Sequence, residues 1–168
     1  MNFNHVTNRR DTESIKWNYF DEDVLPMWVA DMDFQSPPEV IDALHARVEH
    51  GIFGYGGPPE GTRSAICQHL EDRHHWNIDP SEIDFISGVV TGFTHAIYSL
   101  TDPGDTVLIQ TPAYPPFLAA PESTGRQCLI NALIQADDGR YEIDFDDFEA
   151  KIGSGVRLFI LCNPQNPT

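Results

Sequence analysis

Apolar residues recur at the spacing of an amphipathic helix in the first third of the chain. The stretch SPPEVIDALHARVEHG opens with Ser36 and Glu39 in an S-x-x-E capping box and closes with Gly51, a common helix stop. Its apolar stripe consists of Val40, Ile41, Leu44 and Val48. The pattern predicts a helix from Ser36 to Gly51. A second helix is expected over about residues 62–76, beyond a loop rich in glycine and proline at residues 52–61.

From residue 83 onward, short apolar runs alternate with helical stretches. The expected strands cover residues 83–87, 106–110, 127–134 and 156–162. The expected helices lie within residues 88–100, 111–125 and 145–152. This alternation predicts a layered α/β architecture with a largely parallel sheet. In such sheets ligands bind beyond the carboxyl ends of strands, so the loops after Ser87, Gln110 and Cys162 are the places to look.

Charge and composition exclude several classes of function. The 168 residues carry a formal net charge of -16, from 26 acidic and 10 basic residues, which argues against a nucleic-acid partner. The acidic stretches at residues 21–24 and 144–149 are typical of solvated faces. Cys67, Cys128 and Cys162 are too scattered to suggest a disulfide framework or a zinc site, and we expect no metal. Without a signal-peptide pattern or a membrane-length apolar run, the sequence predicts a soluble cytoplasmic protein with no membrane partner.

Three loops after expected strands carry candidate chemistry. GVVTGFTHAI, at residues 88–97, could expose backbone N–H groups to a phosphate at a helix start, although ordinary strand-to-helix packing explains it better when it is taken alone. Tyr114 in TPAYPPF could stack on a flat ligand or merely cover its loop. The NPQNPT stretch at residues 163–168 offers side-chain amides, but by itself it is typical of a proline-rich turn.

The combination of these loops is more specific than any one of them. PMWVADMDF, FGYGGPPEG, SGVVTGFTHAI, TPAYPPF and NPQNPT together resemble the class I/II aminotransferase group of fold type I pyridoxal-phosphate (PLP) enzymes, and within it the MalY/PatB subfamily of cystathionine β-lyases, or C-S lyases. The resemblance implies a three-layer α/β/α large domain, here incomplete. It places residues 1–50 in an N-terminal segment that belongs to the small domain and the dimer interface, and residues 51–168 in the first part of the PLP-binding domain.

The resemblance also implies the cofactor contacts. The backbone at Gly92, Phe93 and Thr94 would cradle the phosphate, the ring of Tyr114 would stack on the pyridine, and the amide of Asn166 would donate to the phenolic oxygen.

Two further positions follow from the same resemblance. Tyr55 matches a tyrosine that reaches the phosphate of the neighbouring subunit in a homodimer, and the segment near Ala30 matches one that approaches the substrate carboxylate. Thr91 stands where many relatives of this subfamily have proline, so the phosphate loop departs from the family pattern at this position.

The implied reaction is β-elimination on a sulfur-containing amino acid: a proton leaves Cα, a thiolate leaves Cβ, and pyruvate and ammonia are the final products. It needs a Schiff-base lysine, and the only lysines, Lys16 and Lys151, have neither the position nor the setting of that residue, so both are interpreted as surface charges. We therefore expect no catalytic residue in this chain, which resembles the N-terminal portion of a longer enzyme. Alone it should bind PLP weakly, lack turnover and aggregate.

Two alternatives remain open on the sequence. One is a PLP-dependent aminotransferase of the same fold, which differs in returning the amino group to a keto acid. The other is a non-catalytic interaction protein that keeps the dimer surface around Tyr55.

Overall fold

The computed structural model describes residues 3–58, 60–153 and 155–168, and the chain divides into two compact units, Met1–Gly57 and Pro58–Thr168. The division falls a few residues beyond the boundary predicted at residue 50. The assignment of the first segment to a small domain and of the remainder to a large domain stays a prediction.

The first unit contains two helices, α1 (Ile15–Asn18) and α2 (Pro38–His50), joined by irregular chain. The predicted capping box is wrong. Pro37 is the N-cap of α2, so Ser36 lies one position too early to bond to the first turn. The stop at Gly51 is confirmed, because this residue adopts a left-handed φ of 71° that glycine tolerates best.

The apolar stripe of α2 lies largely open within its unit. Leu44 is 62% exposed and Val48 is 65% exposed. The helix that the spacing predicts is confirmed, but in the described residues its apolar stripe does not form a core.

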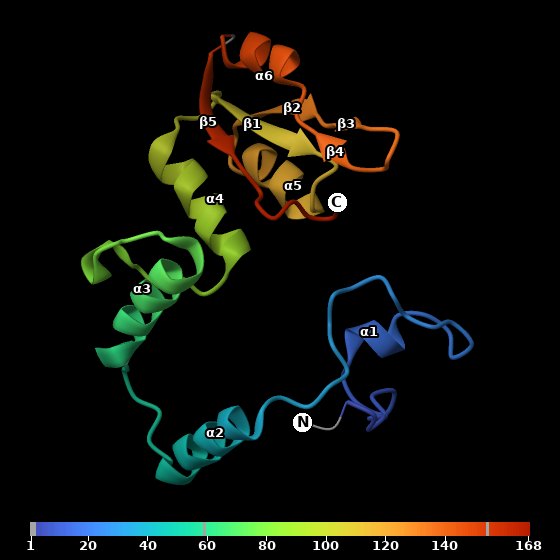
Figure 1. Ribbon diagram of the computed structural model, residues 1–168, viewed down its shortest axis with the longest axis vertical. Helices are drawn as coiled ribbons and strands as arrows, with labels where there is room; N and C mark the ends of the chain where they lie inside the picture. Colours follow the sequence, from blue (N-terminus) through green and yellow to red (C-terminus); the bar gives the residue numbers. More distant parts are fainter. Residues whose placement is uncertain (1–2, 59, 154) are drawn as a thin grey trace. The chain divides into compact units, whose positions relative to one another are not determined.

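The second unit is built on a parallel sheet (Figure 1). Its strands are β1 (Thr106–Thr111), β2 (Gln127–Ala132) and β5 (Val156–Ile160), in the order β2-β1-β5. β1 pairs with β2 in regular register from Thr106 opposite Gln127 to Thr111 opposite Ala132. A short antiparallel hairpin, β3 (Ile134–Gln135) and β4 (Tyr141–Glu142), follows β2. The predicted α/β class with a parallel sheet is confirmed.

Helices cover both faces of this sheet (Figure 1). α4 (Val89–Leu100) and α5 (Pro115–Ser123) lie on one face and α6 (Phe145–Ile152) lies on the other, whereas α3 (Glu60–His74) and the 3-10 turn η1 (Pro80–Glu82) contact each other and lie away from the sheet. The buried core lies between β1, α4 and α5, and consists of Ile97, Val107, Ile109, Phe117 and Ala120. On the other face, Phe148 of α6 packs edge-on against Phe159 of β5, with ring centroids 5.0 Å apart. The arrangement is the three-layer α/β/α order that the family resemblance implies.

The strand expected at residues 83–87 is not formed. This segment is irregular between η1 and α4. A strand needs a hydrogen-bonded neighbour, and the sheet of the described residues ends at β2 on one side and β5 on the other.

A buried amide network joins the sheet to α6. Asn131 of β2 is fully buried, and its Oδ1 accepts a hydrogen bond of 3.0 Å from Nε2 of Gln110 on β1. Its Nδ2 donates to Oδ2 of Asp147 at 2.7 Å and to the carbonyl oxygen of Asp144 at 3.2 Å. Each polar group of Asn131 thus has a partner, which removes the cost of burying an amide.

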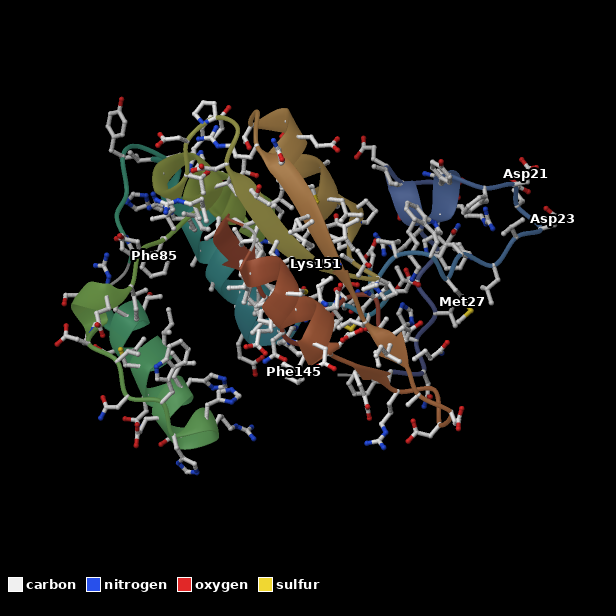
Figure 2. The ribbon with its side chains drawn as sticks, turned by 90° about the horizontal axis from the view of Figure 1, so that it is seen from above. Asp21, Asp23, Met27, Phe85, Phe145 and Lys151 are labelled. Atoms are coloured by element: carbon white, nitrogen blue, oxygen red, sulfur yellow. The ribbon has the colours of Figure 1, made fainter. Side chains whose placement is uncertain are left out.

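The two acidic stretches behave differently. Asp21 and Asp23 lie at the tip of the loop after α1 and point to solvent, as expected of a solvated face (Figure 2). In the second stretch, Asp144 instead caps α6 by accepting a hydrogen bond of 3.0 Å from the backbone N–H of Asp147. Part of this acidity is therefore structural. Among the described residues, no helix is both long and apolar enough to cross a membrane.

Candidate cofactor site

The first turn of α4 presents the backbone donors that an anion needs. The helix begins at Val89 with Gly88 as its N-cap. An α-helix leaves its first N–H groups without intrahelical partners, and here these belong to Gly88, Val89, Val90 and Thr91. The positive end of the helix dipole lies at the same place, so a phosphate would be stabilised there.

The three residues predicted to cradle a phosphate lie one turn further into the helix. The N–H of Gly92 already donates to the carbonyl oxygen of Gly88 at 2.9 Å. The ring of Phe93 stacks on Phe117 of α5, with centroids 4.5 Å apart and planes 22° apart, and the hydroxyl of Thr94 donates to the carbonyl oxygen of Val90 at 2.7 Å. The free N–H groups therefore precede the predicted set. In the sequence, the position of Gly88 directly before Val89 and Val90 was the signal that the helix begins there.

Gly92 has a different local role. A Cβ built at this residue would lie 2.0 Å from Cδ1 of Ile86, so glycine leaves the space that the end of the Ile86 side chain occupies against the first turn of the helix.

Tyr114 and Asn166 come together although 52 residues separate them. The backbone N–H of Tyr114 donates to the carbonyl oxygen of Asn166 at 3.0 Å, and Nε2 of Gln165 donates to the carbonyl oxygen of Pro112. Tyr114 is the N-cap of α5, and its side chain is 44% exposed. The loop after β1 and the loop after β5 are thus joined, which leaves the tyrosine ring accessible beside the loop that carries the amide.

A cavity of about 640 Å³ opens at this edge of the sheet. Its lining comes from the last residues of β1, from the hairpin and from the end of the chain, and includes Gln110, Tyr141, Cys162, Asn163, Gln165 and Thr168. Its size is in the range of small-molecule sites. The loop of Asn166 therefore borders a space able to hold a ligand.

Tyr55 and Ala30, the two other predicted contacts, belong to the first unit. Tyr55 is fully exposed in the loop after α2, and Ala30 is exposed in the irregular chain between the helices. Both side chains are accessible, and their contacts with a second subunit and with a substrate stay predictions.

Both lysines are held in ion pairs. Nζ of Lys16 lies 2.7 Å from Oδ2 of Asp33, and its side chain is only 11% exposed, so the interpretation of Lys16 as a surface charge is wrong. Nζ of Lys151 lies 2.6 Å from Oδ2 of Asp147, one turn away on α6, and lowers the pKa of that carboxyl. Nζ of each lysine is therefore already engaged by a carboxylate.

Comparison with known proteins identifies the family of this chain. The model of the family "Aminotransferase class I and II" matches residues 22–168. The cystathionine beta-lyase PatB of Bacillus subtilis is 46% identical over an alignment that covers 100% of this chain and 45% of the relative.

Two solved structures are similar throughout this chain. The PLP-bound C-S lyase from Staphylococcus hominis has a TM-score of 0.91 and 32% identity, and covers 100% of this chain and 44% of its own. Cystalysin from Treponema denticola, which contains pyridoxal 5'-phosphate, has a TM-score of 0.90 and 33% identity, with coverages of 99% and 44%. The chain spans less than half the length of these relatives. With the family model matching residues 22–168, this chain belongs to the class I and II aminotransferase family.

Proposed function

We propose that this chain supplies the cofactor-contacting part of a PLP-dependent C-S β-lyase that acts on sulfur-containing amino acids. The observation that carries the proposal is the hydrogen bond between the N–H of Tyr114 and the carbonyl oxygen of Asn166. Because of it, an aromatic ring and the loop of a side-chain amide meet at the carboxyl edge of the sheet, where α/β proteins bind ligands.

The residues present fit PLP in their donor chemistry. The first-turn N–H groups of Val89, Val90 and Thr91 are suited to the phosphate, and the accessible ring of Tyr114 is suited to the pyridine. The amide of Asn166 can donate to an oxygen on the ring. The prediction that Gly92, Phe93 and Thr94 make the phosphate contact is kept in modified form: we propose that they shape and anchor the turn whose preceding residues donate.

When bound, PLP supplies an electron sink for the carbanion formed as the Cα proton leaves. The residues of this chain would bind and orient it, and we expect the lysine that moves the proton to lie outside these 168 residues. Ala30 and its neighbours would contact the substrate carboxylate. Tyr55 would reach the phosphate of a second subunit in a homodimer, and we place the enzyme in the cytoplasm.

The test is product analysis. The full-length protein that carries this chain, loaded with PLP, should release pyruvate, ammonia and a thiol from cystathionine when no keto acid is added as an amino acceptor. A strict requirement for a keto acid would identify an aminotransferase instead, and the lyase proposal would then be wrong. The 168-residue chain alone should release no pyruvate, and steady release from it would also contradict the proposal.

A further inference from the structure

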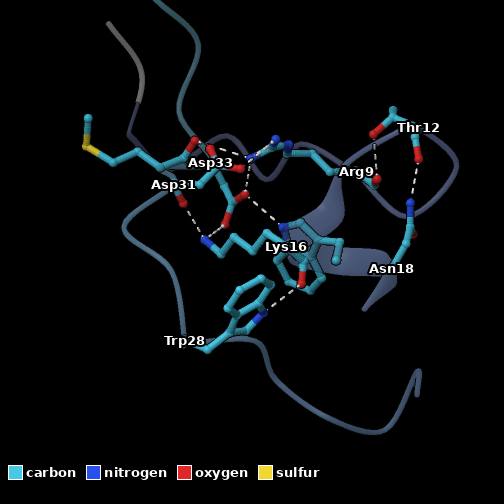
Figure 3. A network of polar contacts seen from close by, with 9 residues as sticks. Arg9, Thr12, Lys16, Asn18, Trp28, Asp31 and Asp33 are labelled. Carbon is cyan, nitrogen blue, oxygen red and sulfur yellow. Dashed lines mark hydrogen bonds and ion pairs between the residues drawn. The ribbon is translucent and has the colours of Figure 1, made fainter. Parts of the chain in front are cut away.

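A cluster of charged side chains in the first unit ties two distant segments together (Figure 3). Asp33 lies at its centre and accepts three hydrogen bonds. Oδ1 receives Nη1 of Arg9 at 2.9 Å and Nε1 of Trp17 at 2.8 Å, and Oδ2 receives Nζ of Lys16 at 2.7 Å. Nη2 of Arg9 also lies 2.9 Å from Oδ2 of Asp31. The donors all come from residues 9–17 and the acceptors from residues 31–33.

The same donors hold the backbone of the acceptor segment. Nζ of Lys16 donates to the carbonyl oxygen of Asp31 at 2.6 Å, and Nη1 of Arg9 reaches the carbonyl oxygen of Met32 at 3.4 Å. Backbone and side chain are thus fixed at consecutive residues. This leaves the segment directly after Ala30 little freedom to move.

Apolar packing cannot supply this order. Among residues 3–57, only Ser14 and Pro26 are buried. Met32 is 76% exposed and Phe34 is 52% exposed, so their side chains do not anchor the segment in a core. Exposed ion pairs contribute little one at a time, but here one carboxylate receives three donors and the lysine is 11% exposed. The polar cluster is the structure that shapes residues 30–33.

We propose that Lys16 and Asp33 are positioning residues that hold Ala30 and its backbone in the conformation that binds the substrate carboxylate. The inference rests on the proposed function and adds residues that do not touch the substrate. Two positive groups, Arg9 and Lys16, balance two negative groups, Asp31 and Asp33, so the cluster carries no net charge. Its effect on a carboxylate ligand therefore comes from the shape of the segment.

This charge balance separates positioning from simple electrostatics. Asp33→Asn leaves the cluster with an excess positive charge, whereas Lys16→Met leaves it with an excess negative charge. If position matters, both variants weaken the binding of cystathionine. If only the local field matters, Asp33→Asn should strengthen binding and Lys16→Met should weaken it.

The experiment uses the full-length PLP-loaded enzyme. We expect both variants to raise KM for cystathionine by about tenfold with kcat changed less than about twofold, and Lys16→Arg to restore most of the loss. Asp21→Asn is the matched control, because this carboxylate is exposed at the tip of a loop in the same unit (Figure 2). Amide hydrogen exchange at residues 30–33 should accelerate in Asp33→Asn and Lys16→Met and remain unchanged in the control.

Each result decides the matter. If KM is unchanged in both variants, or shifts in opposite directions, the positioning role is wrong. The proposed function still stands in that case, as long as the wild-type enzyme has lyase activity. If both variants lose thermal stability and a matching fraction of active enzyme while KM stays constant, the cluster has a purely structural role and the inference is wrong. A wild-type enzyme without lyase activity would overturn the proposed function, and this inference with it.

Discussion

The backbone N–H of Tyr114 lies 3.0 Å from the carbonyl oxygen of Asn166 and donates a hydrogen bond to it. This bond uses only main-chain atoms, so it leaves the tyrosine ring and the asparagine amide available to a ligand. The position of each loop is thereby set independently of the side chain that it presents.

Removing the amide should therefore weaken the cofactor without disturbing the fold. For Asn166→Ala in the full-length enzyme, we expect the dissociation constant of PLP to rise by about tenfold or more, which corresponds to one lost hydrogen bond to a charged group. The measurement is an absorbance titration of the apoenzyme with PLP. Asn77→Ala removes the same side-chain group from an exposed position between α3 and η1 and is the control. Equal affinity in Asn166→Ala and the wild type would show that the amide does not contact the cofactor.

Proline substitutions test where the helix with the free donors begins. Thr91 lies in the first turn of α4, where proline removes only an N–H without an intrahelical partner, so Thr91→Pro should change the free energy of unfolding by about 1 kcal/mol or less. His95→Pro lies inside the helix at an exposed position and should cost about 3 kcal/mol or more. Urea unfolding compares the two. Similar costs would mean that α4 begins elsewhere.

The cluster around Asp33 predicts a loss of stability in acid. Hydrogen bonds from Lys16, then Trp17 and Arg9, lower the pKa of Asp33 to about 2. A carboxyl whose pKa falls on folding contributes its full stabilisation above its unfolded pKa of about 3.9 and loses it as the pH falls through the folded value. Exchange protection at residues 30–33 should therefore decline between about pH 4 and pH 2.

Asp33→Asn should weaken this acid response, because only Asp31, whose pKa is also lowered by Arg9, then remains to titrate in the cluster. A response of unchanged size in Asp33→Asn would contradict the assignment.

Arg126 joins the ends of two helices. Its side chain is 7% exposed, and its N–H groups donate to Oγ1 and the carbonyl oxygen of Thr101, the C-cap of α4, and to the carbonyl oxygen of Thr124, the C-cap of α5. Its guanidinium also lies 5.0 Å from the ring centroid of Tyr98. Positive charge is favourable at helix C-termini, and several donors are used at once.

Arg126→Ala should therefore lower the free energy of unfolding by about 3 kcal/mol, because buried carbonyls lose charged partners. Arg126→Lys keeps the charge but not the planar guanidinium fork, so its free energy of unfolding should lie between those of the wild type and Arg126→Ala. Urea unfolding of all three proteins gives the comparison. A lysine variant as stable as the wild type would mean that charge alone accounts for the effect.

Elements that are bounded in the sequence by charged, glycine or proline residues were predictable. The helix at residues 145–152 was predicted within its observed bounds, and the strand at residues 106–110 matches β1 to within one residue, because the charged, glycine and proline residues around them mark where each ends. The meeting of Tyr114 and Asn166 was anticipated only as a consequence of parallel strands. This contact requires β5 to lie next to β1, and the sequences of the two loops do not determine the order of the strands.

The errors share a cause, which is that local pattern does not report partners. Residues 83–87 have the composition of a strand but no neighbour to pair with in the described sheet. Ser36 fits the capping pattern, yet the two prolines after it move the helix start forward. Lys16 reads as a solvent-exposed charge because Asp33, its partner, lies in a segment that the sequence presents as unrelated.

The buried amide of Asn131 gives the sheet a means of rejecting misalignment. It stands directly opposite Gln110 in the paired strands. If β2 slid by a single residue along β1, the two amides would separate and an apolar side chain would replace one of them, leaving polar groups dry and unbonded at a cost of about 1–3 kcal/mol each. Apolar side chains tolerate such a slip more readily, since one aliphatic contact can replace another. One polar pair in an otherwise apolar layer thus favours the correct strand register over registers shifted by one residue. The register is fixed on β1, the strand that leads into the loop of Tyr114.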